Sequence, residues 1–332
     1  MKFLGAADTS ALVDWPAAIR CMREAYAATA TPKAVPGRLI AAETTSWLRC
    51  MPAIPTSGRF MGTKQISRTR TGKVAYLITL FDRESGELAW MIDAIALTAL
   101  RTAATSIAAV DMLTRPGAPI DLAILGSGLE ATKHLAAMAG TRTIRSLRVF
   151  SPTEANRAAF ACMAEEKYGI KARPVDSAQE AVDGATHVFA TARSRGELPI
   201  LYGAWLAPGA VIVSVGSTIP AQREIDASVV ERASLIIADV VEEVATETGD
   251  MIAATNAGIA YADKMFSLHD LAQKRVPRER LEDGGVHLFK SVGSALQDIA
   301  IAELAVACAE RAGAGVETGI ALELKQSIGR NV

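Results

Sequence analysis

The most informative residues form the run IDLAILGSGLEA at Ile120–Ala131, where three small residues, Gly126, Gly128 and Ala131, follow an apolar stretch. A helical pattern, KHLAAMAG, comes directly after it. In a strand–turn–helix of this kind, the first Gly allows the tight turn and the second lets backbone N–H groups approach a pyrophosphate. The small third residue lets helix and strand pack closely. The pattern predicts a dinucleotide site at the positive end of a helix; an ordinary Gly-rich turn is the alternative.

Four cationic side chains in the first third of the chain could bind an acidic substrate. Lys64 lies in the strand pattern FMGTKQIS, and Arg101 lies in LTALRTAATSIAA, a helical pattern otherwise made of small and apolar residues. Arg38 precedes a strand pattern, and Arg49 lies two residues before Met51. A carboxylate held by Arg and Lys side chains would explain this group. A solvent-facing strand lysine and a helix-end arginine that reaches water are the alternatives.

Small and hydroxyl residues follow two further strand patterns. Gly216, Ser217 and Thr218 end the strand pattern VIVSVGSTIP, and Thr191 ends HVFATA. Ligands of open α/β folds bind at the carboxyl ends of the strands, so these residues are candidate cofactor contacts. A plain strand-end turn remains open, and the run Arg223-Glu224-Ile225-Asp226 is expected to cap the next helix.

The first part of the chain must position the cations. Residues 10–30 have helical spacing, and 38–92 hold five short strand patterns separated by turn residues. An Ala-rich helix is expected over 94–114, and Arg115-Pro116-Gly117 ends it. This Pro-Gly is the predicted domain boundary.

Beyond the boundary, strands and helices alternate to about residue 240. The strand patterns are LAILG, SLRVFS, HVFATA, VIVSVGS and LIIAD. This alternation is typical of βαβ units and predicts an α/β fold with a Rossmann-type doubly wound sheet. The helices between them are expected near 129–139, 153–167, 177–183, 202–207 and 226–232. A mixed segment follows at 241–290, and 292–312 is strongly helical.

Composition limits the classes of function. The chain has 332 residues, half of them hydrophobic, with 35 basic and 36 acidic side chains. A net charge of −1 gives no electrostatic basis for binding nucleic acid or an anionic membrane. No targeting segment and no membrane span are expected, because no run of 18 uninterrupted apolar residues occurs. The four cysteines are scattered without a CxxC and the histidines form no cluster, so we expect reduced thiols, a cytoplasmic protein and no metal.

Four blocks together resemble one family. LTALRTAATSIAA, GSGLEA, VGSTIPAQREID and LFKSVGSALQDIAIAELA are similar in order and spacing to those of the ornithine cyclodeaminase/μ-crystallin family. The resemblance covers nearly the whole chain and implies an NAD(P)-dependent enzyme that acts on amino or imino acids. It implies an N-terminal α+β domain at 1–115 that binds substrate and forms a homodimer. The C-terminal helix, about 305–332, would join that domain, and 116–304 would be the NAD(P)-binding Rossmann domain.

The resemblance also implies roles for single residues. Arg38, Lys64 and Arg101 would hold the substrate carboxylate, and Thr79 in YLITLFD would contact the cofactor. The KS pair of LFKSVG would lie near the nicotinamide. With the strand ends above, the predicted cofactor-binding residues are Thr79, Gly126, Ser127, Gly128, Leu129, Glu130, Ser151, Thr153, Thr191, Val215, Gly216, Ser217, Thr218, Lys290 and Ser291.

Two departures from the family pattern bear on the substrate. Cyclodeaminases and the related alanine dehydrogenases have an Asp where this chain has Thr218, which weakens the cyclodeaminase interpretation. Cyclodeaminases also have a Glu two residues before Met51, where this chain has Arg49. Exchange of an anion for a cation reverses the charge that the substrate should carry, so Arg49 favours a second carboxylate.

The predicted reaction is hydride transfer between NAD(P)H and the C=N carbon of a 2-imino acid, which gives an L-amino acid. Lys64 would polarise or protonate the imine nitrogen, a role that calls for neighbouring cations to lower its pKa toward neutrality. The favoured substrate is iminosuccinate, reduced to L-aspartate. A cyclic ketimine, alanine-type chemistry and ornithine-type chemistry are the alternatives. A μ-crystallin-like protein that binds NAD(P)H without turnover is the alternative of another class.

The end of the second Rossmann strand, LRVFSPTEANR, bears on the choice of cofactor. An acid there would bind the ribose hydroxyls of NAD, and an Arg would meet the 2′-phosphate of NADP. This chain has Ser151, Pro152 and Thr153 instead. Glu154 would repel a phosphate, whereas Arg157 could reach back from the following helix. NAD(H) is therefore favoured over NADP(H).

Overall fold

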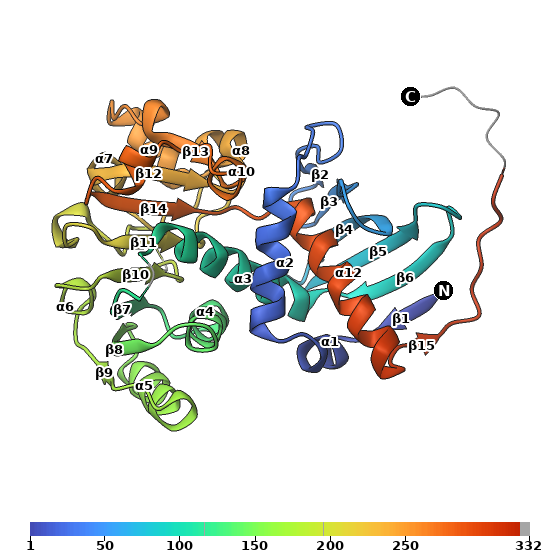
Figure 1. Cartoon of the computed structure of the whole chain (residues 1–332), viewed down its shortest axis with the longest axis horizontal. Helices are drawn as coiled ribbons and strands as arrows, with labels where there is room; N and C mark the ends of the chain where they lie inside the picture. The colour runs from blue at the N-terminus through green and yellow to red at the C-terminus, as the bar shows by residue number, and fades with distance from the viewer. Residues whose placement is uncertain (116, 195, 326–332) are drawn as a thin grey trace. The chain divides into compact units, whose positions relative to one another are not determined.

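The computed structural model describes residues 1–115, 117–194 and 196–325. The chain forms two compact units (Figure 1). Unit 1 comprises Met1–Asp14, Ala30–Thr98 and the chain from Ala295 onward, and unit 2 comprises Trp15–Thr29 and Ala99–Ser294. Residue 116 of the predicted Pro-Gly boundary lies outside the described residues.

Unit 2 is built on an eight-stranded sheet. Its strands are β7 (Ile120–Leu125), β8 (Ile144–Phe150), β9 (Ala172–Pro174), β10 (His187–Ala190), β11 (Val211–Ser214), β12 (Ala233–Ala238), β13 (Met265–Ser267) and β14 (Val286–Lys290). Their order is β13-β12-β14-β11-β10-β7-β8-β9, and every neighbouring pair is parallel. β8 and β9 lie on one side of β7, and β10 and β11 lie on the other side. The strand order therefore reverses between β7 and β10, which makes this a switch point. The predicted Rossmann-type sheet is confirmed.

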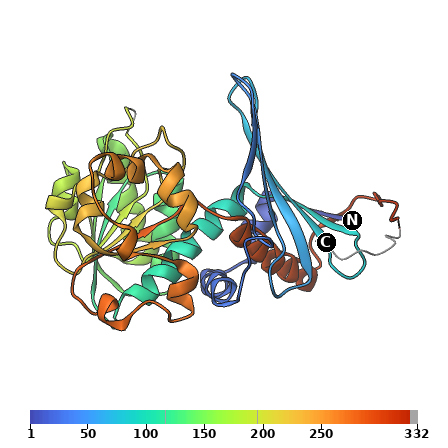
Figure 2. The same ribbon diagram turned by 90° about the horizontal axis from the view of Figure 1, so that it is seen from above.

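Helices cover both faces of this sheet (Figure 2). They are α2 (Trp15–Ala27), α3 (Ile95–Leu113, in unit 2 from Ala99), α4 (Leu129–Ala139), α5 (Glu154–Tyr168), α6 (Ala178–Val182), η1 (Gly203–Trp205), α7 (Ala227–Arg232), α8 (Val241–Glu247), α9 (Gly249–Asn256), η2 (Ala262–Lys264), α10 (Leu268–Ala272) and α11 (Arg278–Leu281). The helix expected at 202–207 is a single 3₁₀ turn.

The helix α2 belongs to unit 2, although 1–115 was expected to form one domain. α2 contacts α4 and α10, so the segment from Trp15 belongs to unit 2. The single helix expected at 10–30 is in fact two, α1 (Ala6–Leu12) and α2. α3 is long and apolar enough to cross a membrane by length and composition alone. Most of it is buried, however, as in the core helix of a globular protein.

Unit 1 is built on a seven-stranded sheet. Its strands are β1 (Lys2–Leu4), β2 (Leu39–Ala42), β3 (Trp47–Ala53), β4 (Phe60–Arg68), β5 (Val74–Asp82), β6 (Leu88–Asp93) and β15 (Val316–Glu317), in the order β15-β1-β6-β5-β4-β3-β2. The β1–β6 pair is parallel and the others are antiparallel. The five strands expected over 38–92 are therefore present as β2–β6.

One face of this sheet is covered by α12 (Ala295–Ala312), which contacts β3, β4 and β5 (Figure 2). The prediction of a helix over about 305–332 is wrong, because α12 ends at Ala312. Gly313 follows with φ +65°, the left-handed conformation that ends many helices. β15 then pairs with β1, and residues 326–332 lie outside the described part of the chain.

Candidate functional site

Lys64 on β4 forms a buried ion pair with Asp298 on α12. The Lys64 Nζ lies 2.6 Å from the Asp298 Oδ2, and both side chains are 1% exposed. Charged groups are rarely buried unless they are paired, so each requires the other. Lys64 was expected among cations, and it also has an anionic partner, Asp298, which favours the charged ammonium form. An ammonium group can donate a proton.

Strand register places two other predicted residues on the same face of the sheet as Lys64. Met51 pairs with Lys64, and Arg49 is two residues away on the same strand, so both point toward the α12 side. The Arg49 guanidinium carbon lies 5.5 Å from the centre of the Trp47 ring. Arg38 lies directly before β2, the strand that pairs with β3. Arg49, Met51 and Lys64 therefore form one cluster, with Arg38 at the neighbouring strand's start.

Thr79 lies on the other face of this sheet. It pairs with Thr63, which is adjacent to Lys64 along β4, and neighbouring residues of a strand point to opposite faces. Thr79 is therefore not part of the Lys64 cluster, and its cofactor contact stays a prediction.

Arg101 belongs to unit 2, where its surroundings are well defined. Its side chain is buried, and a Cβ added to Gly293 would lie 2.7 Å from both terminal guanidinium nitrogens. Burial raises the pKa of Glu130, and the charge of Arg101 opposes that rise. Asp239 fixes the segment beside it, because its carboxylate accepts bonds from the Ser291 hydroxyl at 2.6 Å and the Gly293 N–H at 2.8 Å. Arg101 thus lies close to two predicted cofactor-binding residues, Glu130 and Ser291.

The GSGLEA turn has the geometry that a dinucleotide needs. Gly126 has φ +123°, and a Cβ there would lie 2.9 Å from Ala192 Cβ and 3.2 Å from Thr191 Oγ1, at the β7–β10 switch point. Gly128 is the N-cap of α4, and no atom of the described residues lies within 4 Å of a Cβ added to it. Unsatisfied N–H groups at a helix start, next to open space, fit a pyrophosphate. Leu129 is exposed beside them.

The end of β8 is occupied by hydroxyl groups and one arginine. Ser127 donates to the Ser151 hydroxyl at 3.0 Å, and Thr153 is the N-cap of α5. Arg157 does reach back, since its Nη1 donates to the Ser151 carbonyl at 3.3 Å. Its Nη2 lies 2.7 Å from the carboxylate of Asp176, whose side chain is 91% exposed. The guanidinium at this strand end is therefore paired with an exposed carboxylate.

The segment after β11 is held by hydrogen bonds from its own connecting loop. The Gly216 N–H donates to Glu224 Oε2 at 2.9 Å, and the Ser217 hydroxyl donates to the Gln222 carbonyl at 2.6 Å. The Thr218 N–H donates to Gln222 Oε1 at 3.0 Å. Gly216 and Thr218 keep partial exposure, whereas Val215 and Ser217 are buried.

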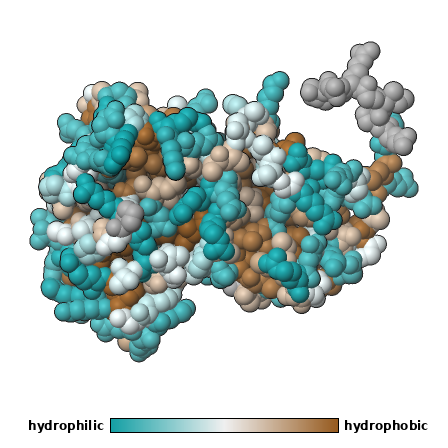
Figure 3. Space-filling model, viewed as in Figure 1, coloured by the Kyte–Doolittle hydropathy of each residue, from teal (hydrophilic) through white to brown (hydrophobic). Residues whose placement is uncertain are grey.

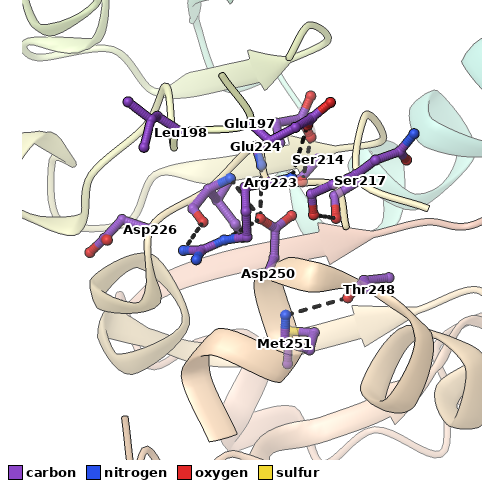
Figure 4. A network of polar contacts seen from close by, with 12 residues as sticks. Glu197, Leu198, Ser214, Ser217, Arg223, Glu224, Asp226, Thr248, Asp250 and Met251 are labelled. Carbon is purple, nitrogen blue, oxygen red and sulfur yellow. Dashed lines mark hydrogen bonds and ion pairs between the residues drawn. The ribbon is translucent and has the colours of Figure 1, made fainter. Parts of the chain in front are cut away.

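Lys290 supports the same segment from within the unit. It is fully buried, and its Nζ donates to the Ser214 hydroxyl at 2.9 Å and to the Ser217 carbonyl at 3.3 Å. The Nζ also lies 3.0 Å from Asp250 Oδ2 (Figure 4 shows Asp250 beneath the segment). Lys290 thus contributes to the predicted cofactor region by holding its backbone.

Sequence reasoning missed the acidic members of both sites. Of the run at 223–226, only Asp226 caps the next helix, by accepting from the Ser228 N–H at 2.9 Å. Glu224 and Asp250 instead lie beneath the loop, and no local pattern marks them. Asp298 carried a signal, since Gln297 and Asp298 are a polar pair among the apolar and small residues that begin the C-terminal helix. Among the described residues, no three His, Cys, Asp or Glu side chains are grouped to hold a metal ion.

Comparison with known proteins places these features in one family. The family model "Ornithine cyclodeaminase/mu-crystallin family" matches residues 9–312. The chain is 31% identical over 264 residues to the ketimine reductase mu-crystallin of Mus musculus, covering 78% of this chain and 79% of the relative. It is 30% identical over 320 residues to the Δ1-pyrroline-2-carboxylate/Δ1-piperideine-2-carboxylate reductase of Azospirillum brasilense, covering 93% and 96%.

A solved structure agrees with the sequence relatives. The structure of Thermococcus litoralis Δ1-pyrroline-2-carboxylate reductase in complex with NADH and L-proline is similar, with a TM-score of 0.85 and 26% identity. The match covers 96% of this chain and 100% of that one. These named relatives are reductases, the class of enzyme that the sequence predicts. The chain belongs to the ornithine cyclodeaminase/mu-crystallin family.

Proposed function

We propose that this protein reduces the C=N bond of a 2-imino acid with NADH and so forms an L-amino acid. The observation that carries the proposal is the buried Lys64–Asp298 pair. The anion keeps the Lys64 ammonium charged, and a charged ammonium can give its proton to an imine nitrogen. NADH, when bound, supplies the hydride that the imine carbon accepts. The two transfers together convert the C=N bond to CH–NH.

Three arginines are proposed to bind the carboxylates of the substrate. Arg49 lies on β3 and shares the sheet face of Lys64. Arg38 directly precedes β2, the strand that pairs with β3. Arg101 is proposed to bind the α-carboxylate, as the family resemblance implies. Arg49 is a cation where the cyclodeaminases of the family have a Glu, which favours a substrate with a second carboxylate, so we favour iminosuccinate, which yields L-aspartate.

A second substrate class has independent support. The named relatives from Mus musculus and Azospirillum brasilense are a ketimine reductase and a reductase of pyrroline and piperideine carboxylates. A cyclic ketimine of this kind carries one carboxylate. It would need the same proton donor, Lys64, and it offers no second carboxylate to Arg49.

NAD(H) is the proposed cofactor. The N–H groups at the start of α4 and the space beside Gly128 fit the pyrophosphate of either dinucleotide. Arg157 reaches the end of β8, where the ribose is predicted to lie, and its pairing with Asp176 competes with binding of a 2′-phosphate. Glu154, exposed at the same helix start, would repel that phosphate.

A homodimer in the cytoplasm completes the proposal. Leu39 and Leu48 are 71% and 44% exposed, and strand register puts both on the sheet face opposite Lys64. Figure 3 shows hydrophobic residues, in brown, among the hydrophilic residues, in teal, on the face that it presents. The four cysteines, all among the described residues, form no disulfide, which fits a reducing compartment. Light scattering on the wild type and on Leu48→Glu tests the dimer.

The experiment that tests the function is NADH consumption with a substrate panel. Oxaloacetate with ammonia supplies iminosuccinate, pyruvate with ammonia supplies 2-iminopropionate, and Δ1-pyrroline-2-carboxylate is the cyclic ketimine. The same keto acids without ammonia are the controls. We expect ammonia-dependent turnover with oxaloacetate. Turnover restricted to the cyclic ketimine would select the second candidate, and no turnover with any C=N compound would refute the proposal.

A further inference from the structure

Five polar side chains are enclosed in unit 2 beneath the segment that follows β11. Each of them is 0% exposed. They come from β11, β14, α9 and the loop between β11 and α7, and Figure 4 shows four of them around one point. We call this set the β11 network; its members are Ser214, Ser217, Glu224, Asp250 and Lys290. Most buried polar groups in proteins are hydrogen-bonded, so the contacts of each member show what it does.

Glu224 and Lys290 together hold the backbone after β11. Glu224 Oε2 accepts the Ser214 hydroxyl at 2.6 Å and the Gly216 N–H at 2.9 Å. Lys290 Nζ donates to the same Ser214 hydroxyl at 2.9 Å and to the Ser217 carbonyl at 3.3 Å. Two peptide groups of this segment, 215–216 and 217–218, are thereby fixed by two buried charged side chains.

Asp250 fixes Glu224 and Lys290 in their turn. Its Oδ1 accepts the N–H groups of Glu224 at 2.8 Å and Ile225 at 3.1 Å, and its Oδ2 lies 3.0 Å from Lys290 Nζ. A carboxylate that binds two backbone N–H groups and an ammonium has little freedom to move. Asp250 is therefore the fixed support of the β11 network.

Glu224 is also in steric contact with Gly216. A Cβ added to Gly216 would overlap the Glu224 Oε1 and come within 3.3 Å of the Arg193 side chain. That oxygen is buried and makes no hydrogen bond to any described residue. The carboxyl group thus touches Gly216 with one oxygen and binds its N–H with the other, so it determines where Gly216 can lie.

Glu224 is the member whose charge can change near neutral pH. Burial raises its pKa to about 7, although the Lys290 charge and the Ser214 hydrogen bond favour ionisation, and Asp250 adds to the rise. Among the described residues, Arg223 also faces the network, with its Nε 3.5 Å from Asp250 Oδ1. Beyond Gly216, Arg193 is paired with Glu197. The ionised carboxylate accepts the Ser214 and Gly216 hydrogen bonds through Oε2. The protonated form also carries an O–H donor, and the buried Oε1 has no hydrogen-bond partner among the described residues.

We propose that Glu224 is a positioning residue of the reductase, whose ionised carboxylate sets the Gly216–Thr218 backbone for the dinucleotide. Glu224 touches no cofactor and acts through the Gly216 peptide. The inference rests on the proposed function, because Val215, Gly216, Ser217 and Thr218 are cofactor contacts only in an NAD(H) enzyme. Its consequence is that NADH affinity rises with pH through the range in which Glu224 ionises.

The test is the Kd for NADH, measured by fluorescence titration from pH 6 to pH 8.5. Wild-type affinity should increase with pH and level off above neutrality. Glu224→Gln keeps an acceptor for Gly216 but cannot ionise, so its Kd should be independent of pH. Glu224→Ala removes the acceptor and should weaken NADH binding by about tenfold at pH 8, as expected for loss of a hydrogen bond to a charged group.

A second variant pair tests the contact with Gly216. Gly216→Ala should weaken NADH binding because its methyl group meets the Glu224 carboxyl group. In the Gly216→Ala/Glu224→Ala double variant that overlap is absent, so the loss should be smaller than the product of the two single losses. Asp226→Ala, which removes the cap of α7 without touching the β11 network, is the control for general destabilisation.

The outcomes separate this inference from the proposed function. If the wild type binds no NADH at any pH, the proposed function fails, and the inference fails with it. If the wild type binds NADH but Glu224→Gln keeps the wild-type pH dependence, the inference alone is overturned. If the loss of NADH affinity in the Gly216→Ala/Glu224→Ala double variant equals the product of the two single losses, the steric coupling is overturned. Should Glu224→Ala not fold, Glu224→Gln still decides.

Discussion

Replacement of Lys64 by Met should affect stability and catalysis by two separable routes. Met keeps the length of the side chain and removes the charge, so Asp298 is left without its partner at 2.6 Å. Both side chains are 1% exposed, so water cannot replace the lost ammonium. Breaking a buried pair in this way costs about 3–5 kcal/mol of unfolding free energy. Loss of the proton donor should lower kcat by about 10²–10⁴-fold.

A double variant separates the two effects. Lys64→Met/Asp298→Leu replaces both charges with apolar groups, and such replacements are often neutral or stabilising. Most of the unfolding free energy should therefore return. The activity should not, because the proposed proton donor is absent from both variants. Asp298→Asn alone should destabilise the fold, since Lys64 is then buried without a counter-charge.

The test compares the wild type with Lys64→Met, Asp298→Asn and Lys64→Met/Asp298→Leu. Urea unfolding gives the unfolding free energy of each protein, steady-state kinetics give kcat, and titration gives the NADH affinity. NADH affinity should stay near the wild-type value in each, because Lys64 is proposed to act on the substrate. A Lys64→Met enzyme whose kcat stays within about twofold of wild type would remove Lys64 from the mechanism. Recovery of activity together with stability in Lys64→Met/Asp298→Leu would show that the pair is only structural.

Four further predictions follow from other residues. Arg101→Ala should lower kcat/KM by the equivalent of about 2–5 kcal/mol with NADH affinity nearly unchanged; an unchanged kcat/KM would make Arg101 structural. Arg49→Glu should reduce turnover of iminosuccinate more than that of a monocarboxylic imine, and equal losses would show that Arg49 does not select the substrate. Burial lowers the pKa of His134 to about 4. Because the unfolded imidazole binds protons up to about pH 6.5, the unfolding free energy should rise between pH 4 and 6.5 by up to about 3 kcal/mol. His134→Gln should flatten that rise in urea titrations, and an unaltered slope would contradict the assignment. The wild type should prefer NADH, and Asp176→Asn should shift kcat/KM toward NADPH by releasing Arg157; a tenfold wild-type preference for NADPH would contradict the cofactor proposal.

Local patterns were sufficient to predict the main elements of both units. The GSGLEA turn lies between β7 and α4 as expected, because strand, turn and helix are each encoded within a few residues. The strands over 38–92 and the helix over 94–114 are also present. Each of these elements has a period of two or 3.6 residues that the sequence displays directly.

Tertiary packing decided what local patterns could not. Helical spacing over 10–30 does not reveal that the segment from Trp15 packs on α4 and α10. The end of the last helix depended on Gly313, which adopts a left-handed conformation. These features depend on contacts or backbone conformation rather than on periodicity.

The candidate site was predictable for its cations and glycines but not for its acids. Lys64 was noticed because a lysine within a strand of small residues is unusual. Its partner Asp298 lies far away in the sequence, and so does Asp250, which supports Lys290. Single-sequence reasoning cannot pair such residues, since the pairing arises when α12 packs on β4 and when α9 meets β14.

Transfer of a label from NADH to the product tests the central claim most directly. The enzyme is supplied with [4,4-²H₂]NADH and with each accepted C=N substrate, and the amino acid formed is analysed by mass spectrometry. The account predicts one deuterium on the α-carbon of the product and none on its nitrogen after exchange in water. NADH oxidation without deuterium on the α-carbon, or an amino acid formed without NADH, would contradict it.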